Sequence, residues 1–295
     1  MKEPFELEWL GGPAEKHFRS VRPKVDELPW GTLGVRLGDY PPLLVDRARV
    51  SWTEAAYNEY CTAAAFAELL RLMLQTQVPL DLIGMASDFV ADEVLHVELT
   101  SRIAMELGGG APYRVDFSEL CPRIDRSLSP RQQASELMVR VCCVGEAFSV
   151  QMLAGCLATA AHPLTRAVLE RIVRDEAPHG RLGWLYLDWI ADELDDAERE
   201  RLADVALDAM LGFEPFWKRL RSRVSDGVTS EGFLLSHVHE LGWMEASAYA
   251  RTAREAMRSD VVAPLARRGI AVRAGALEEM LSGSSATTSL RDARG

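Results

Sequence analysis

The chain has few cysteines and no cysteine motif. Its five cysteines are odd in number and contain no CxxC spacing: Cys61, Cys121, Cys142, Cys143 and Cys156. A CxxC pair would be expected of a rubredoxin-type iron site or of a thioredoxin-like redox motif. An even set at close spacing would be expected of a disulfide framework in a small secreted protein. The composition therefore predicts reduced thiols in a cytoplasmic protein.

Positive charge is also scarce. Lysine and arginine number 33 against 44 aspartates and glutamates, which gives a net charge of -11. Because phosphate backbones require a basic surface, this balance argues against nucleic acid as a partner. It weighs in the same direction against anionic membranes, and we expect no membrane partner. No apolar run in the sequence approaches the length expected of a membrane span, and the first residues lack a signal-peptide layout.

Against this background two short stretches stand out. Both have the form D-E-x-x-H: Asp92 to His96, and Asp175 to His179. Glutamate and histidine three residues apart lie on one face of a helix, so both side chains can reach the same ion. A carboxylate and an imidazole together suit a first-row divalent metal such as iron or manganese. Two such pairs predict a site for two metals.

The surrounding pattern is helical and divides the chain into four parts. Residues 1–45, rich in proline and glycine, predict an extended N-terminal arm anchored by Trp9 and Trp30. Residues 46–191 predict two helical hairpins joined by a longer crossing loop, the ferritin-like version of the four-helix bundle. Residues 192–281 predict additional helices packed on the bundle, and residues 282–295 a disordered tail. The fold class is all-α.

The ends of the predicted helices have recognisable signals. Three consecutive glycines, 108–110, should end the second helix, and Ser129 followed by Pro130 should cap and open the third. Pro178 lies inside the second motif and has no backbone N–H to donate to the carbonyl of Arg174. We therefore expect an irregular turn between Arg174 and His179.

A bundle of this kind requires one inward glutamate from each of the other two helices. On the third helix Glu146 lies among apolar residues, where a carboxylate is costly without a cation. Glu136 is the weaker alternative there, because its position along the antiparallel partner does not match Glu176. On the first helix Glu59 has apolar neighbours, whereas Glu68 shares its side with Arg71 and Gln75 as a surface residue would; Glu54 is a further candidate.

These residues resemble the ligand set of ferritin-like di-iron carboxylate proteins. The resemblance covers about residues 46–191 and is carried by six residues: Glu59, Glu93, His96, Glu146, Glu176 and His179. It implies that they bind a pair of iron ions, with manganese in one or both positions as an alternative, and that these residues are the catalytic ones. It also implies that dioxygen is a co-substrate and that an electron donor is needed.

Several subtypes of this superfamily differ from the chain at named positions. The ribonucleotide reductase small subunit usually has a radical tyrosine where this chain has Thr100, and the arylamine N-oxygenases have an additional histidine ligand where it has Ile172. Rubrerythrins add a CxxC iron site, which is lacking, and ferritins are shorter. Acyl-carrier desaturases share the ligand pattern, and only the acidic net charge of this chain disfavours that subtype. The same charge disfavours the tRNA-hydroxylating relatives.

The function predicted from this resemblance is that of a non-haem di-iron oxygenase or oxidase. It would oxidise a small organic substrate by hydroxylation, desaturation or heteroatom oxidation. The alternatives are a ferroxidase that handles iron without an organic substrate, and a helical protein that keeps the metals for structure. A substrate-sized cavity beside the metals would favour the enzyme, and a homodimer is an open expectation.

Residues beside the ligands are expected to support them. Because metal-bound histidines usually donate their second ring N–H to a carboxylate, Asp175 should reach His96 and Asp92 should reach His179 from the neighbouring helix. Cys142, Cys143 and Thr100 are candidates for lining a cavity near the metals, although core packing is the more common role of a free cysteine.

Overall fold

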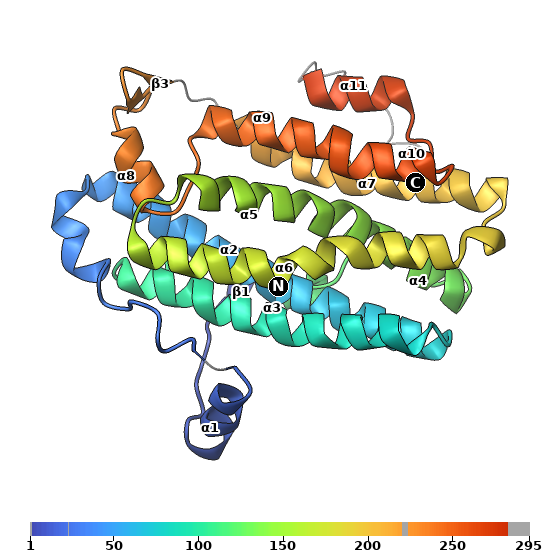
Figure 1. Ribbon diagram of the computed structural model, residues 1–295, viewed down its shortest axis with the longest axis horizontal. Coiled ribbons are helices and arrows are strands. Elements are labelled where there is room, and N and C mark those ends of the chain that lie inside the picture. Colours follow the sequence, from blue (N-terminus) through green and yellow to red (C-terminus); the bar gives the residue numbers. More distant parts are fainter. Residues whose placement is uncertain (1, 23, 220–223, 283–295) are drawn as a thin grey trace.

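Four long helical segments form the body of the protein. The computed structural model describes residues 2–22, 24–219 and 224–282. Helix α2 (Pro42–Gln75) and helix α3 (Leu80–Glu106) form the first antiparallel pair. The third segment comprises α4 (Pro130–Met138), a π-helical stretch η3 (Val139–Glu146) and α5 (Ala147–Thr159), and helix α6 (Pro163–Trp189) is the fourth. Figure 1 shows these segments side by side, as the sequence predicts for an all-α, ferritin-like bundle.

The signals that begin and end these helices act as expected. Gly108 and Gly109 end α3 with positive φ angles of 102° and 114°, a conformation that glycine adopts without strain. The Gly109 N–H donates back to the carbonyl of Ala104 and so closes the last turn. At the start of α4 the Ser129 hydroxyl accepts from the Gln132 N–H, and the Gln132 side chain accepts from the Ser129 N–H.

The structure has no interruption or π-helical turn at Pro178, where the sequence predicts an irregular turn. Helix α6 continues without interruption from Pro163 to Trp189. A widened helical stretch is found instead in the segment that faces α6. It is the π-helix η3, which ends at Glu146. π-Helical turns insert an extra residue per turn and often accompany functional sites. The close approach of the two segments depends on Gly183, where an added Cβ would lie 2.6 Å from the sulfur of Cys143.

The N-terminal segment is not uniformly extended, contrary to the expectation for residues 1–45. It contains helix α1 (Gly12–Ser20) and a 3₁₀ helix η1 (Gly34–Asp39). Trp9 is 51% exposed and packs against Phe18 within the segment, whereas Trp30 packs against the core and donates to the carbonyl of Val25. Helix α1 lies to one side of the bundle in Figure 1.

The crossing loop between α3 and α4 is tied to the N-terminal segment. Strand β2 (Arg114–Val115) of the loop pairs antiparallel with strand β1 (Glu3–Pro4). Next to this pair, the Phe5 N–H donates to the Tyr113 carbonyl. The loop also contains the 3₁₀ turn η2 (Phe117–Glu119). The loop is therefore held over one side of the bundle, between α2 and the third segment.

Additional helices cover the other side of the third segment. After the short turn η4 (Ala191–Glu193), helix α7 (Asp196–Arg219) contacts η3, and helix α9 (Ala246–Ala256) contacts α5 (Figure 1). The remaining elements are strands β3 (Val224–Ser225) and β4 (Val228–Thr229), helix α8 (Leu235–Glu240), the π-helix η5 (Met257–Val262), and helices α10 (Ala263–Arg267) and α11 (Ala274–Ser282). Of the tail predicted for residues 282–295, only Ser282 lies within the described residues, as the last residue of α11.

One helical run meets the length and composition of a membrane span, which the sequence was not expected to contain. It comprises Pro130–Thr159 and has a mean hydropathy of 1.6 over its most apolar window, half of which is buried. In the structure this run is the third segment of the bundle and contacts α2, α6 and α7. Its apolar composition fits that packing, since a helix enclosed by neighbours is apolar on most of its faces.

Candidate metal centre

All six ligands predicted from the sequence converge in the middle of the bundle. Two groups of potential ligand atoms form there, with the atoms of each group within 4.8 Å of one another. One group comprises Glu59, Glu93, His96 and Glu176, and the other Glu93, Glu146, Glu176 and His179. The residues come from α2, α3, η3 and α6, so each of the four segments of the bundle contributes at least one.

Two carboxylates belong to both groups. Glu93 and Glu176 are 0% and 2% exposed and lie in the motifs of the antiparallel helices α3 and α6. A carboxylate has two oxygens, so each of these residues can serve two ions at once. Glu59 and Glu146 lie at opposite ends of the cluster, one in each group. With Glu93 and Glu176 in both groups and Glu59 and Glu146 in one each, these carboxylates would hold a pair of metals.

The histidines turn their Nδ1 atoms toward the carboxylates. His96 Nδ1 lies 3.1 Å from Glu176 and 3.7 Å from Glu93. His179 Nδ1 lies 3.0 Å from both Glu93 and Glu176, and 3.7 Å from Glu146. Both rings are fully buried. Nδ1 is therefore the nitrogen that would bind a metal in each case.

The Nε2 atoms face the two aspartates from the neighbouring helix. His96 Nε2 lies 3.7 Å from Asp175, and His179 Nε2 lies 3.6 Å from Asp92. Both distances are slightly too long for a hydrogen bond, so the predicted cross-helix pairs are present as close contacts. Asp175 is fixed in turn by Arg171, whose Nε donates to it at 2.5 Å. A shift of a few tenths of an ångström would complete both pairs.

Burial and neighbouring charges shift the pKa values of the carboxyl groups in the cluster. Burial raises the pKa of Glu59, and the nearby Glu93 adds to this effect. Burial likewise raises the pKa of Glu146, with a further contribution from Glu176. Burial opposes ionisation of Glu176 as well, but its contacts with His179 and His96 lower its pKa below the usual range. The ionised cluster thus has more negative charge than its own histidines neutralise, which is an environment that favours a cation.

The hydrogen bonding of the buried polar atoms shows whether these residues fit a metal pair. Buried polar atoms are normally hydrogen-bonded, yet several here have no hydrogen-bond partner among the described residues. They are both carboxylate oxygens of Glu93, one of Glu176, and both ring nitrogens of His96 and His179. Oxygen and imidazole donors of this kind suit iron or manganese. A metal pair would satisfy the atoms that face the cluster.

The two rejected glutamates have other partners. Glu68 accepts two hydrogen bonds of 2.9 Å from Arg71 of its own helix and one of 2.8 Å from Arg126 of the crossing loop. Glu136 is buried but is bonded to Arg140 and Arg201. A buried carboxylate with arginine partners does not require a metal.

A cavity of about 620 Å³ reaches the cluster at Glu146. Its walls are formed by α2, by the crossing loop and by the segment around η3, and Phe213 of α7 contributes to the lining. Cys61 and Cys121 line this cavity, whereas Cys142, Cys143 and Thr100 do not. Cys143 packs against Gly183, and the Thr100 hydroxyl donates to the carbonyl of His96. Apart from Glu146, these lining residues were missed in the sequence, because many of them lie in a loop without periodicity.

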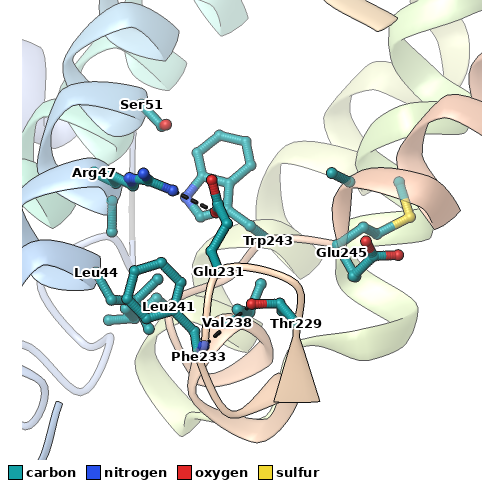
Figure 2. Close-up of a pocket in the computed structure, with 13 residues that line it drawn as sticks. Leu44, Arg47, Ser51, Thr229, Glu231, Phe233, Val238, Leu241, Trp243 and Glu245 are labelled. Atoms are coloured by element: carbon teal, nitrogen blue, oxygen red, sulfur yellow. Dashed lines mark hydrogen bonds and ion pairs between the residues drawn. The ribbon is translucent and has the colours of Figure 1, made fainter. Parts of the chain in front are cut away.

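A second, smaller pocket lies apart from the cluster. It has a volume of about 160 Å³ and is bounded by the first turns of α2 and by the segment that precedes α9. Figure 2 shows Arg47 and Glu231 paired beside the ring of Trp243. None of the six predicted ligands lines this pocket.

Comparisons with known proteins add little to this picture. No protein-family model matches the chain, and no curated protein matches it. Among solved structures, it is similar to "Protein 19 with aldehyde deformylating oxidase activity" from Synechococcus, with 16% sequence identity and a TM-score of 0.48. That alignment covers 82% of this chain and 97% of the other. The assignment of the site therefore depends on the residues of this chain, whose four helical segments bring the six candidate ligands together.

Proposed function

We propose that the protein is a non-haem di-iron oxidase or oxygenase that uses dioxygen to oxidise a small organic substrate. The observation that supports this most directly is the cavity of about 620 Å³ that ends at Glu146. Pockets of roughly 300–1,000 Å³ are typical of small-molecule sites. A site that only stored charge or held the bundle together would have no need of such a space beside one ligand.

Each residue has a defined task in this proposal. Glu93 and Glu176 would lie between the two ions, with Glu59 and His96 on one and Glu146 and His179 on the other. Asp175 and Asp92 would orient the imidazoles through their Nε2 atoms. When bound, a pair of ferrous ions supplies the two electrons that dioxygen needs for its first reduction.

The chain also keeps water away from the histidine side of the cluster. The ring of Phe89 lies 3.9 Å from the ring of His179, centroid to centroid, and Phe66 packs at 5.5 Å. An apolar wall of this kind strengthens electrostatic interactions and limits side reactions with water. The opposite side, at Glu146, is the side that is open to the cavity, so substrate would approach there.

The decisive experiment starts with anaerobic loading of the metal-free protein with ferrous iron. We expect two iron ions per chain, and rapid optical changes on mixing with dioxygen in a stopped-flow instrument. Glu93→Ala should lower the stoichiometry to one ion or fewer, whereas Glu68→Ala, a surface control on α2, should leave it at two. A stoichiometry of two in Glu93→Ala would contradict the proposed centre.

The ferroxidase alternative is separated by supplying iron in excess. A ferroxidase would oxidise many ferrous ions per chain and release or store the product. The proposed enzyme should oxidise about two per chain and then stop until electrons are supplied. Continued oxidation of ferrous iron beyond two ions per chain would support the ferroxidase and contradict the proposed enzyme.

A further inference from the structure

The cavity beside Glu146 has an uneven distribution of charge that bears on its ligand. Its lining includes three acidic residues, all of which have partners: Glu146 belongs to the metal centre, Asp116 accepts from the Ser118 N–H and hydroxyl, and Glu119 is paired with Arg123. Glu119 is thus balanced by Arg123, whereas the uncharged Ser118 groups leave the negative charge of Asp116 in place.

The cations of the same cavity fall into two classes. Arg140 is neutralised from outside, because its guanidinium bonds to Glu136 at 3.2 Å and to Asp208 at 2.7 Å. Lys2 and Arg114 are different. Both are exposed at the rim, and among the described residues no carboxylate lies within ion-pair distance of either; Arg114 donates only to the backbone carbonyl of Lys2. The rim thus has an excess of positive charge on a protein whose net charge is -11.

The interior between the rim and Glu146 is largely aromatic and aliphatic. The rings of Tyr57 and Tyr113 lie 5.5 Å apart, centroid to centroid. The other apolar residues of the lining are Ala65, Val115, Leu120, Pro122, Val141 and Phe213. The side chains of Asn58, Tyr113 and Ser149 are uncharged polar groups in this wall without a hydrogen bond to another described residue. A ligand that enters from the rim therefore meets positive charge first, then apolar surface, and the metal centre last.

We propose that the cavity binds an organic carboxylate, with the carboxylate held at the rim by Lys2 and Arg114 and the apolar body directed toward Glu146. This inference rests on the proposed function, because it identifies the cavity as the substrate site. The rim charges would both attract the anion and fix which end of the molecule reaches the metals. They would also repel ferrous ions, which disfavours this cavity as an iron path.

The position of β2 gives the rim its geometry. Arg114 lies in the strand that pairs with β1, and the register places it opposite Pro4. Through this pairing the N-terminal strand brings Lys2 to the same rim, although the two residues are far apart in the sequence. Arg114 belongs to this small sheet, and Lys2 directly precedes its first strand and accepts from Arg114 through its backbone carbonyl.

The test compares two ligands that differ only in charge. The probes are 6-phenylhexanoate and 6-phenylhexan-1-ol, which share one apolar body. Their dissociation constants are measured by titration calorimetry on the metal-free and the manganese-loaded protein. We expect the carboxylate to bind about 3–10-fold more tightly than the alcohol, the range that two surface ion pairs supply. Raising the salt concentration should reduce this preference by screening.

Substitutions then show which residues cause the preference for the carboxylate. The double variant Lys2→Gln, Arg114→Gln should abolish the preference for the carboxylate and leave binding of the alcohol unchanged. Arg126→Gln is the matched control, because Arg126 lies in the same loop and is paired with Glu68, and neither of these two residues lines the cavity. Thr62→Phe should block both ligands by filling the cavity, whereas Ser51→Phe, which fills the pocket of Figure 2, should block neither.

The outcomes separate this inference from the proposed function. Equal binding of acid and alcohol, or a preference that survives in the double variant, overturns the carboxylate assignment even if the iron-loaded protein consumes dioxygen. A preference that depends on Lys2 and Arg114 in a protein that never consumes dioxygen supports the assignment and overturns the proposed enzyme.

Discussion

Replacing Glu146 by glutamine should have opposite effects on stability with and without metal. The substitution keeps the size of the side chain and removes its charge. Glu146 is 5% exposed and lies within 4.8 Å of Glu93 and Glu176, while His179 Nδ1 is 3.7 Å away. The raised pKa of Glu146 shows that burial and these neighbours disfavour its ionised form.

The size of the effect follows from these distances. With an effective dielectric constant of about 20, each of the two carboxylate repulsions costs at least about 3.5 kcal/mol, and the attraction to a protonated His179 returns about 4.5 kcal/mol. The remainder is a net repulsion of about 2–3 kcal/mol. Uptake of a proton relieves part of it, so we expect Glu146→Gln to stabilise the metal-free protein by about 1 kcal/mol. This corresponds to a rise in Tm of about 2 °C.

In the metal-loaded protein Glu146→Gln should lower the stability instead of raising it. A metal at 100 times its Kd stabilises the folded state by about 2.7 kcal/mol, so two sites give about 5 kcal/mol. At about 2 °C per kcal/mol this is a rise of about 10 °C. Glu146→Gln should lose at least half of it, because one ion loses a ligand. Manganese is the suitable probe, since it is not oxidised during a thermal scan.

The control is Glu136→Gln, which removes another buried carboxylate from the same segment. Glu136 is bonded to Arg140 and Arg201, so its loss should destabilise the protein by about 2 kcal/mol in both states and leave the rise caused by metal unchanged. The reasoning is refuted if Glu146→Gln lowers the Tm of the metal-free protein and retains the full rise on addition of manganese.

Three further predictions concern the surroundings of the site and the fold. Asp175→Asn should retain the helical circular dichroism spectrum but weaken one metal by about 10–100-fold, as measured by competition with a chelator; unchanged affinity for both ions would show that Asp175 does not orient His96. Glu68, whose pKa is lowered to about 2 chiefly by its bonds with Arg71, should stabilise the protein by about 1 kcal/mol at pH 7 after allowance for the solvent exposure of its partners. Because the folded-state pKa lies below the unfolded value, the difference in denaturant midpoint between the wild type and Glu68→Gln should shrink as the pH falls from about 4.5 toward 2, and a pH-independent difference would argue against this origin. Gly183→Ala should destabilise the protein by about 1–3 kcal/mol, because the added Cβ would overlap the Cys143 sulfur. Gly84→Ala on α3 is the control: an added Cβ there has nothing within 4 Å, so the substitution should stabilise the protein by about 0.5–1 kcal/mol. Equal effects of the two substitutions on the free energy of unfolding would mean that the close packing at Gly183 is not required.

The sequence by itself predicted the six candidate ligands and the helices that present them. A glutamate and a histidine three residues apart must share a helix face, so Glu93 with His96 and Glu176 with His179 could be paired without coordinates. Apolar neighbours identified Glu59 and Glu146 because a carboxylate among them needs a cation. The helix ends at Gly108 and Ser129 were also predictable, since they depend on backbone conformation and capping within a few residues.

Only the tertiary structure decided how the cluster is shared and where it opens. Which carboxylates belong to both groups depends on the relative position of the antiparallel helices along the bundle. The π-helical stretch lies at Val139–Glu146, in contact with α6, and not at Pro178. The cavity depends on a crossing loop without periodicity and on a two-residue strand pair that brings Lys2 beside Arg114. Contacts between residues more than a hundred positions apart leave no local pattern in the sequence, because they are set by the docking of whole segments.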